Sequence, residues 1–225
     1  MRCAWLLLVG SLILASANPS EAAAKDALAR NTLGADLVKQ GKFDEALMEF
    51  QQAIALDPRL AAAQANLAYT FDRLGRMDEA IVAYKRAIEL DPRNGTLFNN
   101  LGVLYTKKGQ QEEAVAMLEQ GIKIDPSNSL LQKNLEIAQK SRTILQQRED
   151  QIADAKKLAQ ARPKDPQAAY NVARILATYG RNDEALEWLS KASELGYHDL
   201  ASAKIDPTFA VLKNDPRFQR ITEKR

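Results

Sequence analysis

The chain has 225 residues, of which 36 are alanine and 29 are leucine, against only 10 glycines and 8 prolines, so its composition favours helix. Ordinary hydrophobic (46%) and charged (27%) fractions exclude a disordered or collagen-like chain. Lysine plus arginine (31) nearly equal aspartate plus glutamate (29), so we expect no nucleic-acid partner, and the single Cys3 and single His198 exclude a multi-ligand Cys/His zinc site.

The first segment indicates an export signal. Met1-Arg2 gives a positive start, Cys3 to Ala15 is uncharged and mostly apolar, and Ala15-Ser16-Ala17 has small residues at the two positions that a signal peptidase recognises. We therefore expect residues 1–17 to be a signal peptide cleaved after Ala17. The mature protein would be exported, to the periplasm or the exterior.

Two alternatives stay open at this end. Ala22-Ala23-Ala24 offers a second cleavage point, although Pro19-Ser20-Glu21 before it is typical of a helix start capped by Ser20. An uncleaved N-terminal membrane anchor would need about 20 apolar residues, whereas the stretch here has about 15. We expect no membrane insertion after cleavage.

A constant interval organises the next part of the chain. An Asp-Pro step recurs with its aspartate at positions 57, 91 and 125, and a glycine precedes each proline at the same distance, at Gly41, Gly75 and Gly109. A fixed period of about 34 residues is typical of a solenoid. Each unit is predicted to be two helices, with the glycine in a left-handed conformation at the end of the first and the Asp-Pro step at the end of the second.

Two further features recur inside each unit. Acidic pairs such as Asp78-Glu79 are expected to cap and charge the start of the second helix. Small residues are expected to let the paired helices approach closely, with Gly34, Ala68 and Gly102 meeting Ala46, Ala80 and Ala114.

These positions resemble a known repeat. The third unit has an aromatic residue, Leu-Gly, an aromatic residue, alanine and proline at the places of the tetratricopeptide repeat motif: Phe98, Leu101, Gly102, Tyr105, Ala114 and Pro126. The resemblance implies an all-α fold, a right-handed superhelical solenoid of antiparallel helix pairs. It places three repeats at residues 27–128.

A further repeat is predicted at residues 166–198, because Tyr179 to Ala185 matches Leu74 to Ala80. Residues 129–165 between them keep a helical pattern but have no glycine, and no proline before Pro163. This segment is either a degenerate repeat with a turn near residues 147–150 or one long linking helix, and the sequence leaves both open.

The end of the chain is predicted to cap the solenoid. Asp206-Pro207 and Asp215-Pro216 each supply an N-cap followed by proline, which predicts two short helices within residues 199–225. Their apolar residues, Phe209, Leu212, Phe218 and Ile221, would cover the last exposed face around Trp188. The tail is similar to the ending of a group of bacterial tetratricopeptide proteins, of an "end-of-group" type.

Function is expected on the concave surface lined by the first helix of each unit. Asparagine holds the sixth place of four units, which suits an extended peptide because an amide both donates and accepts. This row is similar to the asparagine ladder with which some members of the family hold peptides. The predicted peptide-binding residues are Asn66, Asn100, Asn134, Asn171, Tyr69, Arg73 and Lys107.

A purely structural role for these side chains stays open. The asparagines could bond to a neighbouring repeat or to water, and Tyr69 could serve only in packing between first helices. The carboxylate clamp of the family's chaperone-binding members is not expected, because Asn31, Ala35, Thr96 and Asn100 occupy its charged and flanking places.

No enzyme activity, cofactor or metal is expected, and we predict no catalytic, cofactor-binding or metal-ligating residues. The glycines are isolated, so there is no phosphate-binding loop, and helix starts account for the acidic pairs. One hypothesis is an exported adaptor that binds extended segments of other proteins. The alternatives are a structural or assembly subunit that oligomerises through its middle helix, around Ile144 and Leu145, or an accessory subunit of an enzyme complex.

Overall fold

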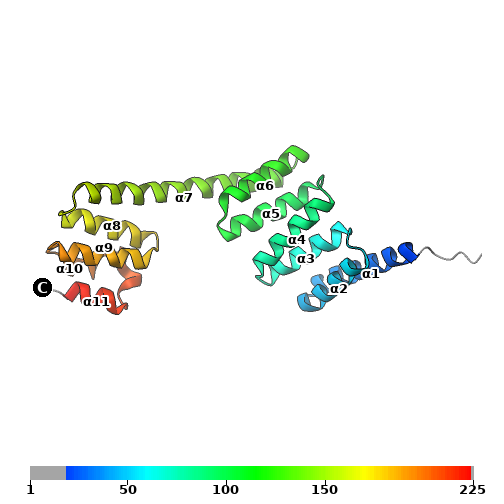
Figure 1. Cartoon of the computed structure of the whole chain (residues 1–225), viewed down its shortest axis with the longest axis horizontal. Coiled ribbons are helices and arrows are strands. Elements are labelled where there is room, and N and C mark those ends of the chain that lie inside the picture. The colour runs from blue at the N-terminus through cyan, green and yellow to red at the C-terminus, as the bar shows by residue number, and fades with distance from the viewer. Residues whose placement is uncertain (1–18, 224–225) are drawn as a thin grey trace, which may run out of the picture. The chain divides into compact units, whose positions relative to one another are not determined.

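The computed structural model describes residues 19–223. The expected signal peptide at residues 1–17 therefore lies outside the described residues. Within them every regular element is a helix (Figure 1). The first six are α1 (Pro19–Lys39), α2 (Phe43–Leu56), α3 (Ala61–Arg73), α4 (Met77–Leu90), α5 (Gly95–Lys108) and α6 (Gln111–Ile124). They are followed by α7 (Ser129–Ala161), α8 (Pro166–Thr178), α9 (Asn182–Glu194), α10 (Leu200–Ala203), the 3-10 helix η1 (Pro207–Leu212) and α11 (Pro216–Glu223).

The chain divides into two compact units, one up to Gln139 and one from Lys140 onward. In the first, α1 pairs with α2, α3 with α4 and α5 with α6, and the second helices α2 and α4 also pack on the first helix of the next pair. Large buried side chains such as Phe50, Leu101 and Leu118 fill the core. This is the stacked helix-pair solenoid that the repeat period predicts.

The glycine turns are as predicted. Gly41, Gly75, Gly109 and Gly180 have φ between 74° and 80°, a conformation that side chains with a Cβ rarely adopt. Each ends the first helix of a pair. The second helices of the first three pairs end at Asp57, Asp91 and Asp125, whose backbone N–H groups still bond to the preceding turn.

The prediction that the acidic pairs cap the second helices is wrong in one respect. The N-cap positions of α2, α4, α6 and α9 are held by Lys42, Arg76, Gln110 and Arg181, and none of them caps through its side chain. The acidic residues lie in the first turn, where they favour the positive end of the helix dipole. Arg76 and Arg181 then pair with the acid three residues later, Glu79 and Glu184.

Close helix packing at the small residues is confirmed, but with different nearest neighbours from those expected. A Cβ added to Gly34 would lie 2.6 Å from the ring of Phe50, and one added to Gly102 would lie 2.6 Å from Leu118 Cγ. Phe50 and Leu118, one turn after Ala46 and Ala114 on the second helices, thus leave room only for glycine at positions 34 and 102.

Residues 129–161 form one continuous helix, α7. Its N-terminal part belongs to the core of the first unit, where Leu131 packs on Gly121 of α6. Its C-terminal part belongs to the core of the second unit through Ile152 and Ala159. Between them, residues 142–150 are exposed.

The second unit consists of the C-terminal part of α7, the α8–α9 pair and the tail. Asp206 caps η1 by accepting from the Thr208 N–H, and Phe209, Leu212, Phe218 and Ile221 of the tail are buried, as predicted. Phe209 lies 5.9 Å from Tyr170 of α8 and 5.7 Å from Phe218, measured between ring centroids. Helix α10 is an additional turn, capped by Asp199, that was not predicted from the sequence.

Candidate functional site

Helix α3 carries three of the predicted site residues on one face. Asn66, Tyr69 and Arg73 are spaced i, i+3 and i+7, which places them above one another along a helix. Leu67, Ala68 and Phe71 bury the other side of α3 in the core. Packing therefore leaves the three site residues at the surface, and Tyr69 is 38% exposed.

The asparagines are joined in pairs between neighbouring units. Asn66 Nδ2 donates to Asn31 Oδ1 at 2.9 Å, and Asn134 Nδ2 donates to Asn99 Oδ1 at 2.8 Å. Each bond links the fifth place of one unit to the sixth place of the next. Two of the four predicted asparagines thus bond to an asparagine one position beyond a full repeat, a partner that the period alone did not indicate.

Asn100 has a different set of partners because Ala65 occupies the fifth place of the preceding unit. Its Oδ1 accepts from Asn99 Nδ2 at 3.3 Å, and it hydrogen-bonds with Tyr84 of α4. Burial, together with the negative charge of Asp72, raises the pKa of Tyr84 although the bond with Asn100 opposes the shift. The Tyr84 hydroxyl is therefore protonated at neutral pH.

Arg73 is held by aromatic groups. Its Nη1 donates to the Tyr69 hydroxyl at 2.9 Å, and its guanidinium carbon lies 5.3 Å from the ring centroid of Phe43 and 5.8 Å from that of Tyr69. These distances are typical of cation–π contacts. Phe43, the first residue of α2, was not recognised from the sequence because only the fold brings it next to Arg73.

Lys107 links α5 to α3. Its Nζ lies 2.7 Å from Asp72 Oδ2, and the Asp72 side chain is only 15% exposed. Lys39, Arg73 and Lys107 hold the same place in three successive units, in the last turn of each first helix, where a cation also favours the helix dipole. The structure thus connects Asn66, Tyr69, Arg73 and Lys107 through α3 and its neighbours.

Asn171 is not brought together with the other predicted residues. It lies on α8 in the second unit, is exposed, and accepts from Gln167 Nε2 of the same helix at 3.1 Å. It lines a cavity of about 510 Å³ between α7 and α8, beside Arg174 and Leu158. Asn171 therefore does not belong to the same group of contacts as Asn66, Asn100 and Asn134.

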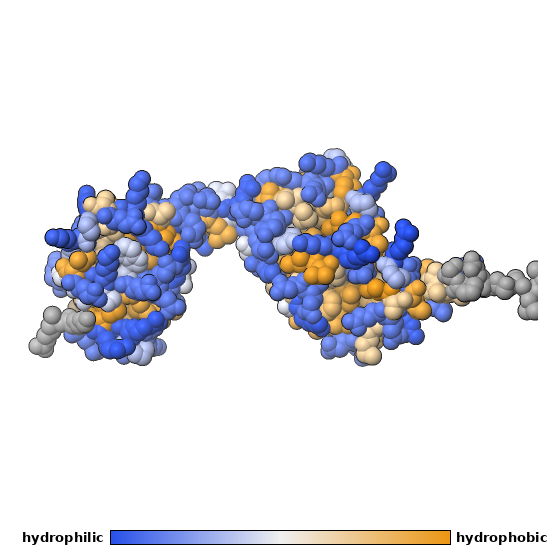
Figure 2. Space-filling view, in the orientation of Figure 1, coloured by the Kyte–Doolittle hydropathy of each residue, from blue (hydrophilic) through white to orange (hydrophobic). Residues whose placement is uncertain are grey.

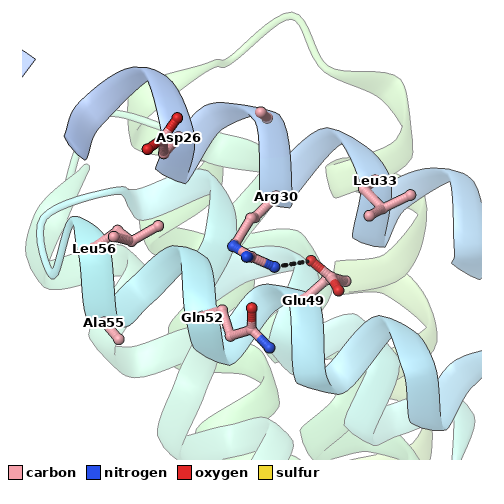
Figure 3. A pocket seen from close by; sticks show the side chains of 8 residues that line it. Asp26, Arg30, Leu33, Glu49, Gln52, Ala55 and Leu56 are labelled. Atoms are coloured by element: carbon pink, nitrogen blue, oxygen red, sulfur yellow. Dashed lines mark hydrogen bonds and ion pairs between the residues drawn. The ribbon is translucent and has the colours of Figure 1, made fainter. Parts of the chain in front are cut away.

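Open cavities of the first unit lie between the two helices of a pair. One of about 700 Å³ lies between α1 and α2, where Arg30 Nη1 and Glu49 Oε2 are 2.9 Å apart and Leu33 and Leu56 flank the ion pair (Figure 3). Another, of about 720 Å³, lies over Leu67 and Val82 of the second pair. Figure 2 shows apolar residues gathered in patches on the visible face of α1 to α6.

The described residues contain no group of three or more histidine, cysteine, aspartate or glutamate side chains arranged to hold a metal ion. Among the helices between residues 19 and 223, none combines the length and the apolar character that crossing a membrane requires.

Comparisons with known proteins bear on the repeat. A tetratricopeptide repeat model matches residues 31–95 and 147–196, which together are more than half of the chain, and a second model of the same description matches residues 73–135. No curated protein matches the chain.

Solved structures share the fold at low sequence identity. The first tetratricopeptide repeat domain of Spaghetti (RPAP3), bound to an HSP90 peptide, is 22% identical with a TM-score of 0.52 over 53% of this chain and 95% of that one. The Arabidopsis OM64 domain is 19% identical with a TM-score of 0.51 over 52% of this chain and 98% of that one. The MamA protein is 18% identical with a TM-score of 0.50 over 81% of this chain and 96% of that one. By its repeat matches and its fold, the chain belongs to the tetratricopeptide repeat family.

Proposed function

We propose that the protein is a non-enzymatic interaction scaffold that binds an extended segment of another protein along the surface of its first helices. The observation that carries this proposal is the set of half-buried asparagines Asn66, Asn100 and Asn134, each hydrogen-bonded to another asparagine. Tyr69 and Arg73 lie on the same helix as Asn66. The Spaghetti domain, which has the same fold, binds an HSP90 peptide. That supports peptides of other proteins as the class of partner.

The bonds between asparagines leave capacity for a ligand. An amide has two N–H donors and an oxygen with two acceptor positions, and the Asn66–Asn31 bond uses only one N–H of Asn66. Peptide backbone offers the complementary N–H and C=O groups at nearly every residue. Because the pairs fix the amides before binding, a segment bound there would lose less free energy to the ordering of side chains.

Replacing Asn66, Asn100 and Asn134 together by alanine tests the proposal. The purified full chain is used to recover partners from an extract of the cell envelope, and the triple variant should recover them at background level. Equal recovery by the triple variant and the wild type would refute binding through the asparagine row.

A matched control removes three exposed amides elsewhere. Gln51 of α2, Gln120 of α6 and Gln160 of α7 are exposed, so their replacement by alanine changes composition to the same extent. This control should recover partners as the wild type does. Far-UV circular dichroism of both variants checks that the helices are retained.

We also propose that the chain is exported with removal of residues 1–17, and that its tail is of the bacterial end-of-group type. The support is the pattern of charge and small side chains in that segment, together with two Asp-Pro-initiated helical turns whose apolar side chains are buried at the end of the chain. Mass spectrometry of the protein from its own cells should find an N-terminus at Asn18. An intact Met1 would contradict export by cleavage.

A second candidate function, assembly through the middle helix, is favoured by one observation. Ile144 and Leu145 of α7 are 49% and 40% exposed within the exposed stretch 142–150. Exposed apolar side chains on a helix can bury against the same face of a second copy of the chain. Light scattering should then show a dimer or larger assembly that dissociates when both residues become polar. A monomer at all concentrations would exclude this function.

A further inference from the structure

Arg73 differs from the equivalent cations of the neighbouring units in its electrostatic partners. Lys39 pairs with Asp36 at 2.8 Å, and Lys107 pairs with Asp72 at 2.7 Å. Arg73 contacts only neutral groups among the described residues, the Tyr69 hydroxyl and the rings of Tyr69 and Phe43. This row of three cations and two carboxylates therefore leaves one positive charge uncompensated, at Arg73.

Asp72, the nearest carboxylate in sequence, is already committed to Lys107. Its side chain is mostly buried, and it follows Phe71, whose ring is in the core. A carboxylate held in this way does not compete with a ligand for Arg73. The Lys107–Asp72 pair is neutral as a whole, so Arg73 is the uncompensated charge at this place.

The aromatic contacts hold the guanidinium and leave most of its hydrogen-bond donors unused. An aromatic ring accepts no conventional hydrogen bond, so among the contacts of Arg73 only the Tyr69 hydroxyl uses one N–H, that of Nη1. The remaining donors form a planar fork that matches the two oxygens of a carboxylate. A side chain held by two rings also loses less rotamer freedom when a ligand binds.

We propose that Arg73 binds the carboxylate of an aspartate or glutamate side chain, so that the segments bound by the asparagine row are acidic. This inference rests on the proposed function and names its class of partner. Asn66 lies two turns before Arg73 on the same face of α3, so one extended segment can use both residues, its backbone at the amide and its acid at the guanidinium.

The test compares two fluorescein-labelled peptides by fluorescence anisotropy with the full chain. One alternates serine and glutamate, and the other alternates serine and glutamine, which keeps shape and hydrogen bonding but removes the charge. The glutamate peptide should bind, more weakly at about 300 mM salt than at about 50 mM. Arg73→Ala should weaken its binding by about tenfold or more, as expected for a lost hydrogen-bonded charge pair.

Matched variants separate this effect from loss of net charge. Arg86 of α4 is also an exposed arginine, paired with Glu89 at 2.6 Å, and Arg86→Ala should leave the affinity within about twofold. Arg73→Lys keeps the charge without the planar fork and should recover only part of the affinity. Circular dichroism confirms that each variant is folded.

Each outcome decides the inference. Equal binding of the two peptides, or no effect of Arg73→Ala on binding of the glutamate peptide, would overturn the inference. If the two peptides bind equally, binding of the glutamine peptide to the triple asparagine variant is measured as well. Loss of that binding would show that the asparagines bind peptides without selecting charge. Binding of neither peptide would also overturn the acidic class, while partner recovery with the triple asparagine variant still tests the groove separately.

Discussion

Gly102→Ala in α5 tests whether close packing of a helix pair or helix propensity decides the stability of the first unit. The added Cβ would lie 2.6 Å from Leu118 Cγ and 2.9 Å from Leu118 Cδ2, whereas ordinary contacts are 3.4–4 Å. Leu118 is fully buried and cannot move away without displacing its own neighbours. The helices of the pair must therefore separate.

The two opposing free energies can be compared. Replacing glycine by alanine inside a helix stabilises it by about 1 kcal/mol. Forcing an extra methyl group into a packed core costs about 1–3 kcal/mol. We expect Gly102→Ala to lower the free energy of unfolding of the first unit by about 1 kcal/mol, so that packing outweighs propensity.

Urea unfolding followed by far-UV circular dichroism measures this difference. Gly95→Ala in the same helix is the control, because its added Cβ would meet nothing closer than Gly121 O at 3.5 Å, and it should cause no loss of stability. A Gly102→Ala variant as stable as the wild type, or more stable, would refute the packing argument.

Three further predictions concern the second unit and α7. Phe209→Ala should lower the free energy of unfolding of the second unit by about 3–5 kcal/mol, since its ring is fully buried; calorimetry should show one transition shifted and the other unchanged. Hydrogen bonds from Arg217 lower the pKa of Asp215 to about 2, so the stability that this carboxylate contributes is present above its ordinary pKa of about 3.9 and is lost as the pH falls toward 2. Asp215→Asn should therefore make the melting temperature fall less steeply over that pH range. An unchanged profile would contradict this prediction. Backbone amides of residues 142–150 should exchange with deuterium faster than those of Leu101 and Leu104, and equal protection would show that this stretch of α7 is covered in solution.

The repeat could be predicted from the sequence because its markers act locally. Gly41 and Gly75 are needed for a left-handed turn wherever they stand, and an Asp-Pro step ends a helix in most contexts. The repeat period then fixes which helices are neighbours. Local turn chemistry and periodicity together sufficed for the helix pairs and for the burial of Phe209.

The contacts of the candidate site could be predicted only in part. The surface position of Asn66, Tyr69 and Arg73 follows from helical spacing, but their partners depend on distances between helices. Phe43 meets Arg73, and Asn31 meets Asn66, across units, and such contacts change with small rotations of a helix. The N-cap error has another origin: each second helix begins one residue before its acidic pair, as α4 does at Met77, so the pair lies inside the first turn.

The asparagine bonds join residues 35 positions apart, one more than the repeat period. This spacing affects how the number of repeats can change. Excision of residues 61–94, one whole unit, would bring Asn31 into register with Asn100, because the removed segment equals one period. Asn31 would then have the kind of partner that it has now in Asn66, while Lys107 would face Val38, the equivalent of Asp72, and lose its ion pair. The Lys107 side chain is 47% exposed, so solvent screens this pair and its contribution is about 1 kcal/mol or less. Gain or loss of a unit is thus nearly neutral for the interface between units, and the number of binding positions can evolve independently of the fold.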